Sequence, residues 1–279
     1  MHAAIATQAG SQDSANEDWA GIAAPGLAVV LDGLSAPDGT GTGCRHGTPW
    51  FVSQLGPRLL TLAVDPVCSL VDALAEAIRQ VAGLHPDCDL THPGTPSATM
   101  VLLRVQDDGA DYLALADAVL LLDTADGLQV VSDERVNQLA GKEREAANRV
   151  PTGSALKLRR RAQLTRALRR ARNRPGGYWV AAADPEAARQ AVTGTVPGRS
   201  LRRAVLLSDG ASRLVDPFEL ATWEELLALL EESGPDELLR QVRAAEAVDP
   251  EGRQWPRTKR SDDATAVYLA LDEAANPQP

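Results

Sequence analysis

Residues 28–33 read Ala28-Val29-Val30-Leu31-Asp32-Gly33, a short apolar run that ends in Asp-Gly. Small and β-branched residues in so short a run predict a buried strand. The Asp-Gly pair then places a carboxylate at the carboxyl end of the strand, beside a residue whose backbone can turn freely. The same arrangement recurs in residues 204–210, Ala204-Val205-Leu206-Leu207-Ser208-Asp209-Gly210. This repetition indicates two carboxylates brought together from distant parts of the chain, as a metal site requires.

Most of the remaining chain alternates between apolar strands and amphipathic helices. Strands are predicted over residues 3–8, 20–24, 97–105, 111–123, 127–132, 178–182, 204–208 and 264–271, and helices over residues 50–62, 71–82 and 185–192, around 223–230 and around 238–242. The turn signals Asp107-Asp108-Gly109 and Ala125-Asp126-Gly127 favour hairpins. Antiparallel pairing is therefore expected rather than a doubly wound parallel sheet.

The composition fits one globular domain spanning residues 1–279. Hydrophobic residues make up 44% of the 279 and charged residues 24%, and no convincing linker divides the chain. Residues 135–175 are interpreted as a basic helical insertion, because nine Lys or Arg and no acid occur between Leu156 and Arg174. This stretch is either a solvated helix face that offsets the acidic remainder or a docking surface for an acidic or phosphorylated partner.

Charge and hydropathy argue against two classes of partner. The formal net charge of −10 is unfavourable for bulk binding to nucleic acid. No apolar run approaches membrane-spanning length, and the amino terminus lacks a basic region followed by a long apolar segment. We therefore expect a cytoplasmic monomer with neither a membrane nor a nucleic-acid partner.

The three cysteines, Cys44, Cys68 and Cys88, are interpreted as small core residues. None forms a Cys-x-x-Cys pair, so neither a disulfide framework nor a zinc ribbon is indicated. Cys44 with His46 or His92 is an alternative thiol catalytic pair, but no orienting residue or oxyanion site is evident beside it. A tyrosine-phosphatase loop is disfavoured because no Arg follows Cys44 at the required spacing.

Acidic residues occur at the ends of several predicted strands: Glu17 and Asp18, Asp32, Asp117, Asp209, and Asp262 and Asp263. Asp117 lies inside the otherwise apolar run Leu113 to Leu122, where a lone carboxylate costs several kcal/mol unless it is paired or bound to a metal. The alternative is that each Asp is a turn residue or a helix cap. Carboxylates alone suit Mg²⁺ or Mn²⁺ rather than zinc.

The order of these motifs resembles that of the metal-dependent protein phosphatases, the type 2C serine/threonine phosphatases, over nearly the whole chain. The motifs that carry the resemblance are Asn16-Glu17-Asp18, Asp32-Gly33, Ser97-Ala98-Thr99, Ala116-Asp117-Ala118, Ser208-Asp209-Gly210 and Asp262-Asp263. The resemblance implies an α+β fold, a four-layer αββα sandwich of two antiparallel sheets flanked by helices. It also implies a metal site at one end of this sandwich.

The resemblance further implies a role for each acidic motif. Asp32 would bridge two metal ions, and Gly33 would contribute its backbone carbonyl. Asp209 and Asp262 would bind one of the ions.

The remaining acids, Glu17 and Asp18, would hold metal-bound waters, and Asp117 would help to bind a third, weaker ion. Two Mg²⁺ or Mn²⁺ ions would lower the pKa of a bridging water, and no protein nucleophile would be needed. The same ions would neutralise charge on the phosphoryl oxygens.

The sequence departs from the family pattern at two positions near the expected phosphate. Family members usually carry an Arg where this chain has Asp13, and some place a His after the first Asp-Gly, where this chain has Leu34. We hypothesise that Arg45 or His46 supplies phosphate contact or proton transfer and is thus catalytic together with Asp32. The alternative is that His46 caps the next helix and Arg45 faces solvent.

Lys259 and Arg260, beside Asp262, are a second source of cations. The expected function is a metal-dependent phosphatase that hydrolyses phosphoserine or phosphothreonine esters on a protein. The alternatives are a phosphatase of a small phosphorylated metabolite and a catalytically weak, phosphatase-like binding or regulatory protein.

Overall fold

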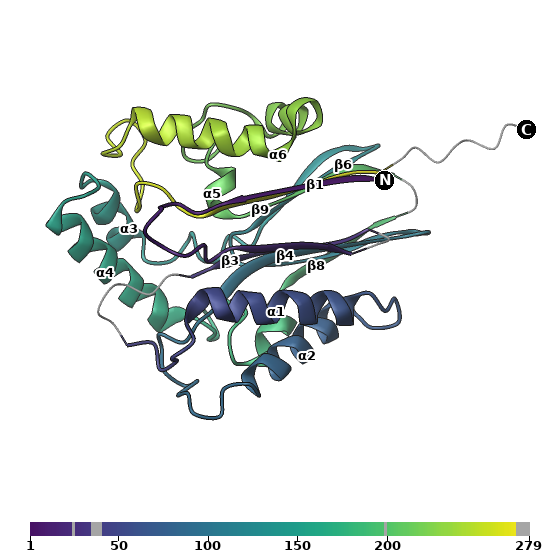
Figure 1. Cartoon of the computed structure of the whole chain (residues 1–279), viewed down its shortest axis with the longest axis horizontal. Helices are drawn as coiled ribbons and strands as arrows, with labels where there is room; N and C mark the ends of the chain where they lie inside the picture. Colours follow the sequence, from purple (N-terminus) through teal and green to yellow (C-terminus); the bar gives the residue numbers. More distant parts are fainter. Residues whose placement is uncertain (24–25, 35–40, 198–199, 272–279) are drawn as a thin grey trace, which may run out of the picture.

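Two five-stranded antiparallel sheets pack face to face between layers of helices (Figure 1). The computed structural model describes residues 1–23, 26–34, 41–197 and 200–271. One sheet has the strand order β1-β10-β9-β6-β7, formed by His2–Gln8, Ala264–Ala270, Leu201–Leu207, Val119–Thr124 and Gly127–Val131. The other has the order β2-β3-β4-β5-β8, formed by Trp19–Ala23, Leu27–Gly33, Ala98–Gln106, Gly109–Leu115 and Val192–Pro197. The predicted α+β class and αββα sandwich are confirmed.

Helices cover both outer faces and one end of this sandwich (Figure 1). The helices α1 (Gly47–Ala63) and α2 (Leu70–Ala82) pack on the second sheet, while α5 (Asp209–Ser212) and α6 (Trp223–Val248) pack on the first. The basic stretch forms α3 (Gly141–Asn148) and α4 (Ala155–Ala171), which lie at the left end of the molecule in Figure 1. No helix of the described chain is both long enough and apolar enough to cross a membrane.

The run Leu27 to Leu31 of strand β3 is wholly apolar, and both of its faces are buried. Val29 and Leu31 pack against α1 and α2, whereas Ala28 and Val30 face the other sheet. Side chains alternate between the two faces of a strand, so a strand in the middle of a four-layer structure has no polar face. Asp32 follows this run directly and marks the point where the strand leaves the core.

The predicted strand over residues 111–123 is wrong, because the chain forms two strands that belong to different sheets. Strand β5 ends at Leu115, and β6 begins at Val119 in the other sheet. Ala116 adopts a φ of 60° at this crossing, and its N–H donates to the Asp133 carboxylate at 3.3 Å. Asp117 therefore lies in a bend between the sheets rather than inside an apolar strand.

Three further differences from the predicted elements lie in the second half of the chain. Residues 178–182 make isolated bridges instead of a strand, and the predicted helix over 185–192 is the 3-10 helix η1 (Pro185–Gln190). Strand β8 was not predicted, because Val192–Pro197 is short and interrupted by Gly194. The two predicted carboxy-terminal helices form one element, α6, with a kink at Gly234.

Candidate metal centre

The ends of β3 and β9 meet at one edge of the sandwich. The N–H of Asp209 donates to Oδ2 of Asp32 at 3.1 Å, although 177 residues separate the two in the chain. Both Asp-Gly pairs need glycine here because the backbone comes very close to another segment. A Cβ at Gly33 would lie 2.3 Å from the carbonyl oxygen of Glu17, and one at Gly210 would lie 1.9 Å from that of Asp263.

Acidic side chains surround the cleft that opens at this edge. The cleft has a volume of about 680 Å³. The acids that line it are Glu17, Asp117, Asp209, Asp262 and Asp263. Asp18 is buried close by, and neither of its carboxylate oxygens has a hydrogen-bond partner within the described chain. An unpartnered buried carboxylate is costly, and a bound cation is one of the few groups that would relieve the cost.

Burial and mutual repulsion raise the pKa values of most of these acids. Burial, followed by the charges of Asp209 and Asp18, raises the pKa of Asp32 well above its usual range. Burial raises the pKa of Asp18 to about 7, although the hydroxyls of Thr265 and Ser208 lie close enough to lower it in part without meeting the geometry of a hydrogen bond.

The acids on the other side of the cleft show the same trend. Burial and the charge of Asp262 raise the pKa of Asp209 to about 7. Burial also raises the pKa of Asp117, against the opposing charge of Arg144. Burial is thus the main cause of each rise, and neighbouring acids add to it.

Asp262 differs from the other acids because it is paired with two cations. Burial alone would raise its pKa, but Lys259 and Arg213 hold the pKa below its usual value. Nζ of Lys259 lies 2.5 Å from Oδ1 of Asp262, and Arg213 donates to Oδ2 at 3.2 Å. Arg213 is itself fixed by the buried Glu246 at 2.7 Å. The carboxylate of Asp262 is thus ionised and held in place.

Asp263 ties the amino-terminal loop to this site. Its Oδ1 accepts the N–H of Gly10 at 2.8 Å, and its Oδ2 accepts the N–H of Glu17 at 2.6 Å. The adjacent Asp18 N–H donates to Oδ1 of Asn16 at 2.9 Å. Asp263 was expected only as a neighbour of Asp262, but its carboxylate sets the position of Glu17.

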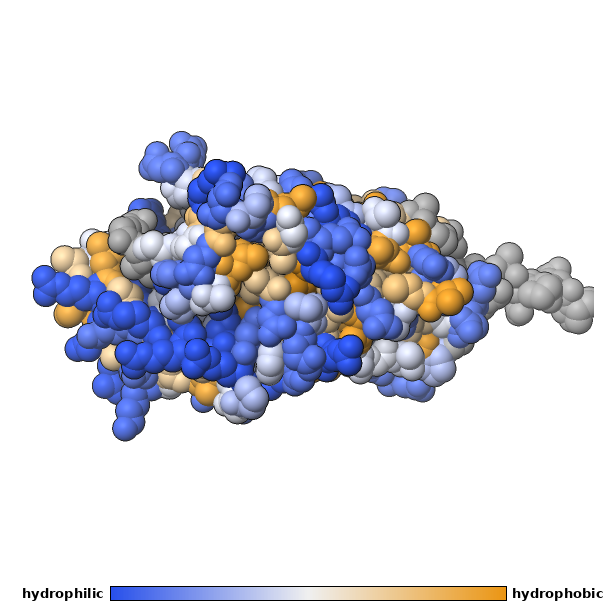
Figure 2. Space-filling view, turned by 90° about the horizontal axis from the view of Figure 1, so that it is seen from below, coloured by the Kyte–Doolittle hydropathy of each residue, from blue (hydrophilic) through white to orange (hydrophobic). Residues whose placement is uncertain are grey.

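Cations, most of them from α3, α4 and the end of α4, also line the cleft. Arg144, Arg161, Arg169 and Arg172 line it together with Lys259. The end of the molecule that carries α4 is strongly hydrophilic on the face seen in Figure 2. A cleft lined by both acids and cations suits a metal ion and an anionic group side by side.

Two cations of the basic stretch anchor α4 instead of facing a partner. Nζ of Lys157 is buried and donates to the carbonyls of Ala147 at 2.7 Å and Val150 at 2.9 Å. At the other end of the helix, Arg172 donates to Oγ of Ser97 at 2.6 Å. The basic composition of this stretch therefore serves partly to attach α4 to the sandwich.

Comparison with known proteins identifies the family. A model of the family described as Protein phosphatase 2C matches residues 2–243. The chain belongs to this family. No curated protein sequence is significantly similar to it.

Solved structures of phosphatase 2C relatives share the fold at low sequence identity. The serine/threonine phosphatase PstP/Ppp of Mycobacterium tuberculosis gives a TM-score of 0.59 at 16% identity, covering 98% of this chain and 99% of that one. The PstP catalytic domain in complex with two manganese ions gives a TM-score of 0.57 at 16% identity, covering 97% of this chain and 98% of that one. The serine/threonine phosphatase Stp1 from Staphylococcus aureus gives a TM-score of 0.53 at 15% identity, covering 97% of this chain and 94% of that one.

The two departures from the phosphatase 2C pattern lie in different surroundings. Asp13 is exposed, and its N–H donates to Oγ of Ser11 at 3.0 Å. Leu34 lines the cleft and adds an apolar surface there. Asp13 therefore offers no phosphate contact, and the cations of the cleft come from other elements.

Arg45 and His46 are not among the residues that line the cleft. The exposed side chain of Arg45 lies 3.6 Å from Asp87. His46 occupies the N-cap position of α1 without a capping hydrogen bond from its side chain, and its Nδ1 lies 3.6 Å from Sγ of Cys44. The side chains that face the cleft in their place are Arg144 and Arg161, which sequence reasoning did not select. A run of arginines in a helix does not reveal which of them face inward.

Proposed function

We propose that this phosphatase 2C family member is a Mg²⁺- or Mn²⁺-dependent phosphatase of phosphoserine and phosphothreonine esters. The observation that supports the proposal is the gathering of acids from four separate parts of the chain around one cleft that cations also line. A fifth part adds Asp32, which accepts the N–H of the lining residue Asp209. The donors are all oxygens, which matches the preference of Mg²⁺ and Mn²⁺. A relative with the same fold has been solved with two manganese ions.

The acids of the cleft fit hard divalent cations. Both oxygens of Asp18 lack partners, and burial, with a smaller effect from neighbouring acids, raises the pKa values of Asp18, Asp32 and Asp209. We assign Asp32, the Gly33 carbonyl, Asp209 and Asp262 to hold two ions. When bound, such ions lower the pKa of water and neutralise phosphoryl charge.

The other acids have supporting roles in the proposal. When ions are bound, Glu17 and Asp18 would orient water around them, and Asp117 would contribute to a third, weaker site. Asp117 suits such a site because the nearby Arg144 only partly offsets the rise in its pKa.

The cations that line the cleft would hold the phosphate of the substrate. Arg144 and Arg161 line the same cleft as the acids, and Nε of Arg144 is buried without a hydrogen-bond partner among the described residues. Guanidinium groups bind phosphate through paired, charge-assisted hydrogen bonds. We therefore assign to Arg144 and Arg161 the phosphate contact that Asp13 does not supply, in place of Arg45 and His46.

A second candidate function is a catalytically weak relative that binds phosphorylated partners. The observation that favours it is the ion pair between Lys259 and Asp262, because a metal ion must compete with this ammonium group for the carboxylate. Such competition lowers the affinity for the ion.

A manganese titration separates the candidates. Turnover of a chromogenic phosphate ester is measured over increasing Mn²⁺ with the full chain and with Asp32→Ala, Asp209→Ala and the control Asp108→Ala, whose residue lies in the exposed turn between β4 and β5. The proposal predicts that the unmodified chain and Asp108→Ala hydrolyse the ester, whereas Asp32→Ala and Asp209→Ala do not. Metal binding without turnover by the unmodified chain favours the weak relative, and the absence of both overturns the metal site.

The substrate class is tested with phosphopeptides and small phosphorylated metabolites at matched concentrations. A higher kcat/KM for phosphoserine and phosphothreonine peptides supports the protein substrate. A preference for a metabolite would replace that part of the proposal while leaving the metal site intact.

A further inference from the structure

A second cluster of metal-binding side chains lies at the open end of the α1–α2 hairpin, apart from the carboxylate cleft. The ligand atoms of Cys44, His46, His85 and Cys88 all lie within 4.8 Å of one another. None of the four residues lines the cleft that holds the acids. Two thiols and two imidazoles are the donors that zinc prefers, whereas Mg²⁺ and Mn²⁺ prefer oxygen. We infer that these four side chains form a structural Zn²⁺ site.

The spacing between ligand atoms agrees with tetrahedral coordination. Nδ1 of His46 lies 3.6 Å from Sγ of Cys44 and 3.7 Å from Sγ of Cys88. Bond lengths of about 2.3 Å to sulfur and about 2.0 to 2.1 Å to nitrogen give tetrahedral sulfur–nitrogen edges of about 3.6 Å. These two edges need almost no change, and the remaining pairs, all within 4.8 Å, need to close by no more than about 1.5 Å.

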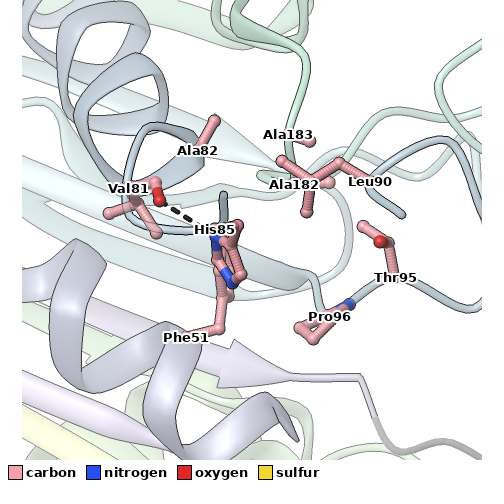
Figure 3. A pocket seen from close by; sticks show the side chains of 9 residues that line it. All are labelled: Phe51, Val81, Ala82, His85, Leu90, Thr95, Pro96, Ala182 and Ala183. Carbon is pink, nitrogen blue, oxygen red and sulfur yellow. Dashed lines mark hydrogen bonds between the residues drawn. The ribbon is translucent and has the colours of Figure 1, made fainter. Parts of the chain in front are cut away.

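The orientation of His85 is independent evidence for a ligand. Its Nδ1 lies 3.0 Å from the carbonyl oxygen of Val81, one turn earlier in α2 (Figure 3). This contact places the proton on Nδ1 and leaves the lone pair on Nε2. The side chain is 6% exposed, and Nε2 has no hydrogen-bond partner within the described chain. Metal-binding histidines commonly donate their second N–H to a backbone carbonyl in this way.

The local backbone presents the ligands in two short pairs. Cys44 and His46 are separated by one residue, and the N–H of His46 donates to Sγ of Cys44 at 3.3 Å. His85 and Cys88 form a turn in which the N–H of Cys88 donates to the His85 carbonyl at 3.2 Å. One pair precedes α1 and the other follows α2, so a shared ion would join the two ends of the hairpin.

The surroundings suit a metal site whose ion and ligands together carry no net charge. Zn²⁺ with two thiolates and two neutral imidazoles is neutral, and Trp50 stacks on His46 with ring centroids 4.2 Å apart. Trp50 also meets the ring of His85 edge-on at 4.7 Å. The cavity beside His85 has a volume of about 10 Å³ and is lined mainly by apolar side chains (Figure 3). It has room for about one water and therefore for no organic ligand.

One contact must change when the ion binds. Nε of Arg45 lies 3.5 Å from Nε2 of His46, which must carry the ring proton once Nδ1 binds zinc. The side chain of Arg45 is 67% exposed and can turn towards Asp87 at little cost. The three cysteines are free thiols, so no disulfide between Cys44 and Cys88 competes with the metal.

Metal analysis of the full chain tests the site. After dialysis against metal-free buffer, the chain should retain about one zinc ion per molecule, as structural sites do. Cys88→Ser should lose it. Two controls should keep it: Cys68→Ser, which changes the third cysteine, and Asp209→Asn, which changes the carboxylate cleft. Zinc retained by Cys88→Ser, or lost from Asp209→Asn alone, would overturn the assignment.

Cobalt provides a second readout in case Cys88→Ser does not fold. Co²⁺ added to the zinc-free full chain should give the absorption bands of tetrahedral cobalt bound to thiolates, and one equivalent of Zn²⁺ should abolish them. Zinc should also protect Cys44 and Cys88, but not Cys68, from a thiol-alkylating reagent. The absence of these bands and of any protection, or a Cys44–Cys88 disulfide in the purified chain, would refute the site.

Discussion

Replacing Asp18 with Asn should stabilise the metal-free chain while it impairs the function of the cleft. Burial raises the pKa of Asp18 from 3.8 to about 7, and both of its oxygens lack a partner in the described chain. A raised pKa means that the folded chain holds this proton more tightly than the unfolded chain does. The cost of ionising Asp18 is therefore absent below about pH 4, grows as the pH rises towards about 7, and is complete above that value.

The size of the effect follows from the pKa. A rise from 3.8 to about 7 corresponds to about 4 kcal/mol at full ionisation. The charges of Asp209 and Asp263 contribute to this rise and adjust when Asp18 changes, so we expect Asp18→Asn to recover about 2 kcal/mol at pH 8. In a domain of this size, that gain raises the unfolding midpoint by roughly 5 °C. At pH 5 the gain should be less than half as large, because most of the cost has not yet developed.

Thermal unfolding followed by circular dichroism measures the prediction at pH 5 and pH 8 in the presence of EDTA. The control is Asp108→Asn, which changes an exposed acid and should leave the midpoint unchanged at both values. Added Mn²⁺ should stabilise the unmodified chain more than Asp18→Asn, and turnover by the variant should fall about tenfold or more. A lower midpoint for Asp18→Asn at pH 8, or an equal gain at both pH values, would refute the account of Asp18 as an uncompensated buried charge.

Three further outcomes test other parts of the site. Arg161→Ala should raise KM for a phosphate ester about tenfold with a smaller change in kcat, whereas Arg159→Ala, at an exposed position of α4, should change neither in steady-state assays. Gly210→Ala should lower the free energy of unfolding by about 3 kcal/mol or more in denaturant titrations, because the added Cβ would lie 1.9 Å from the Asp263 carbonyl oxygen. Gly141→Ala is the control, since its Cβ would meet no atom within 4 Å and the change should be tolerated. The Mn²⁺ concentration for half-maximal activity should fall at least about tenfold from pH 6 to pH 8, since carboxylates with pKa values near 7 must lose protons before they bind metal.

The positions of the acids could be predicted because each follows a strong local signal. Asp32 and Asp209 directly follow apolar strands, and the glycine after each is required by backbone contacts closer than 2.5 Å to any added Cβ. Asp117 was placed in the correct region but in the wrong element. Its surroundings read as one long apolar strand, since the runs before and after it are equally buried in two different sheets. The pattern of apolar residues shows that a segment is buried, but it does not show against which sheet the segment packs.

The Cys/His cluster was missed because its two halves are far apart in sequence and match no common zinc pattern. The pairs Cys44-x-His46 and His85-x-x-Cys88 have metal-binding spacing, but only the antiparallel packing of α1 and α2 brings them together. The absence of a Cys-x-x-Cys pair argues against a zinc ribbon but says nothing about a mixed Cys/His cluster. Pairs of Cys and His at short spacing on either side of a predicted helical hairpin would have provided a usable signal.

The cations were the least predictable part of the cleft because basic residues of one helix, α4, have three different surroundings. Lys157 is buried and holds backbone carbonyls, Arg161 lines the cleft, and Arg159 is exposed. Lys157 and Arg161 are four residues apart and share one face of α4, whereas Arg159 between them lies on the opposite face. The orientation of these faces is set by the packing of α4 at the end of the sandwich, which the local sequence does not encode. An acid at a strand end is placed by the strand itself, whereas a long basic side chain is placed by whatever packs against its helix. For this reason the metal ligands of a site such as this one can be proposed from sequence, while the groups that bind the phosphate require the structure.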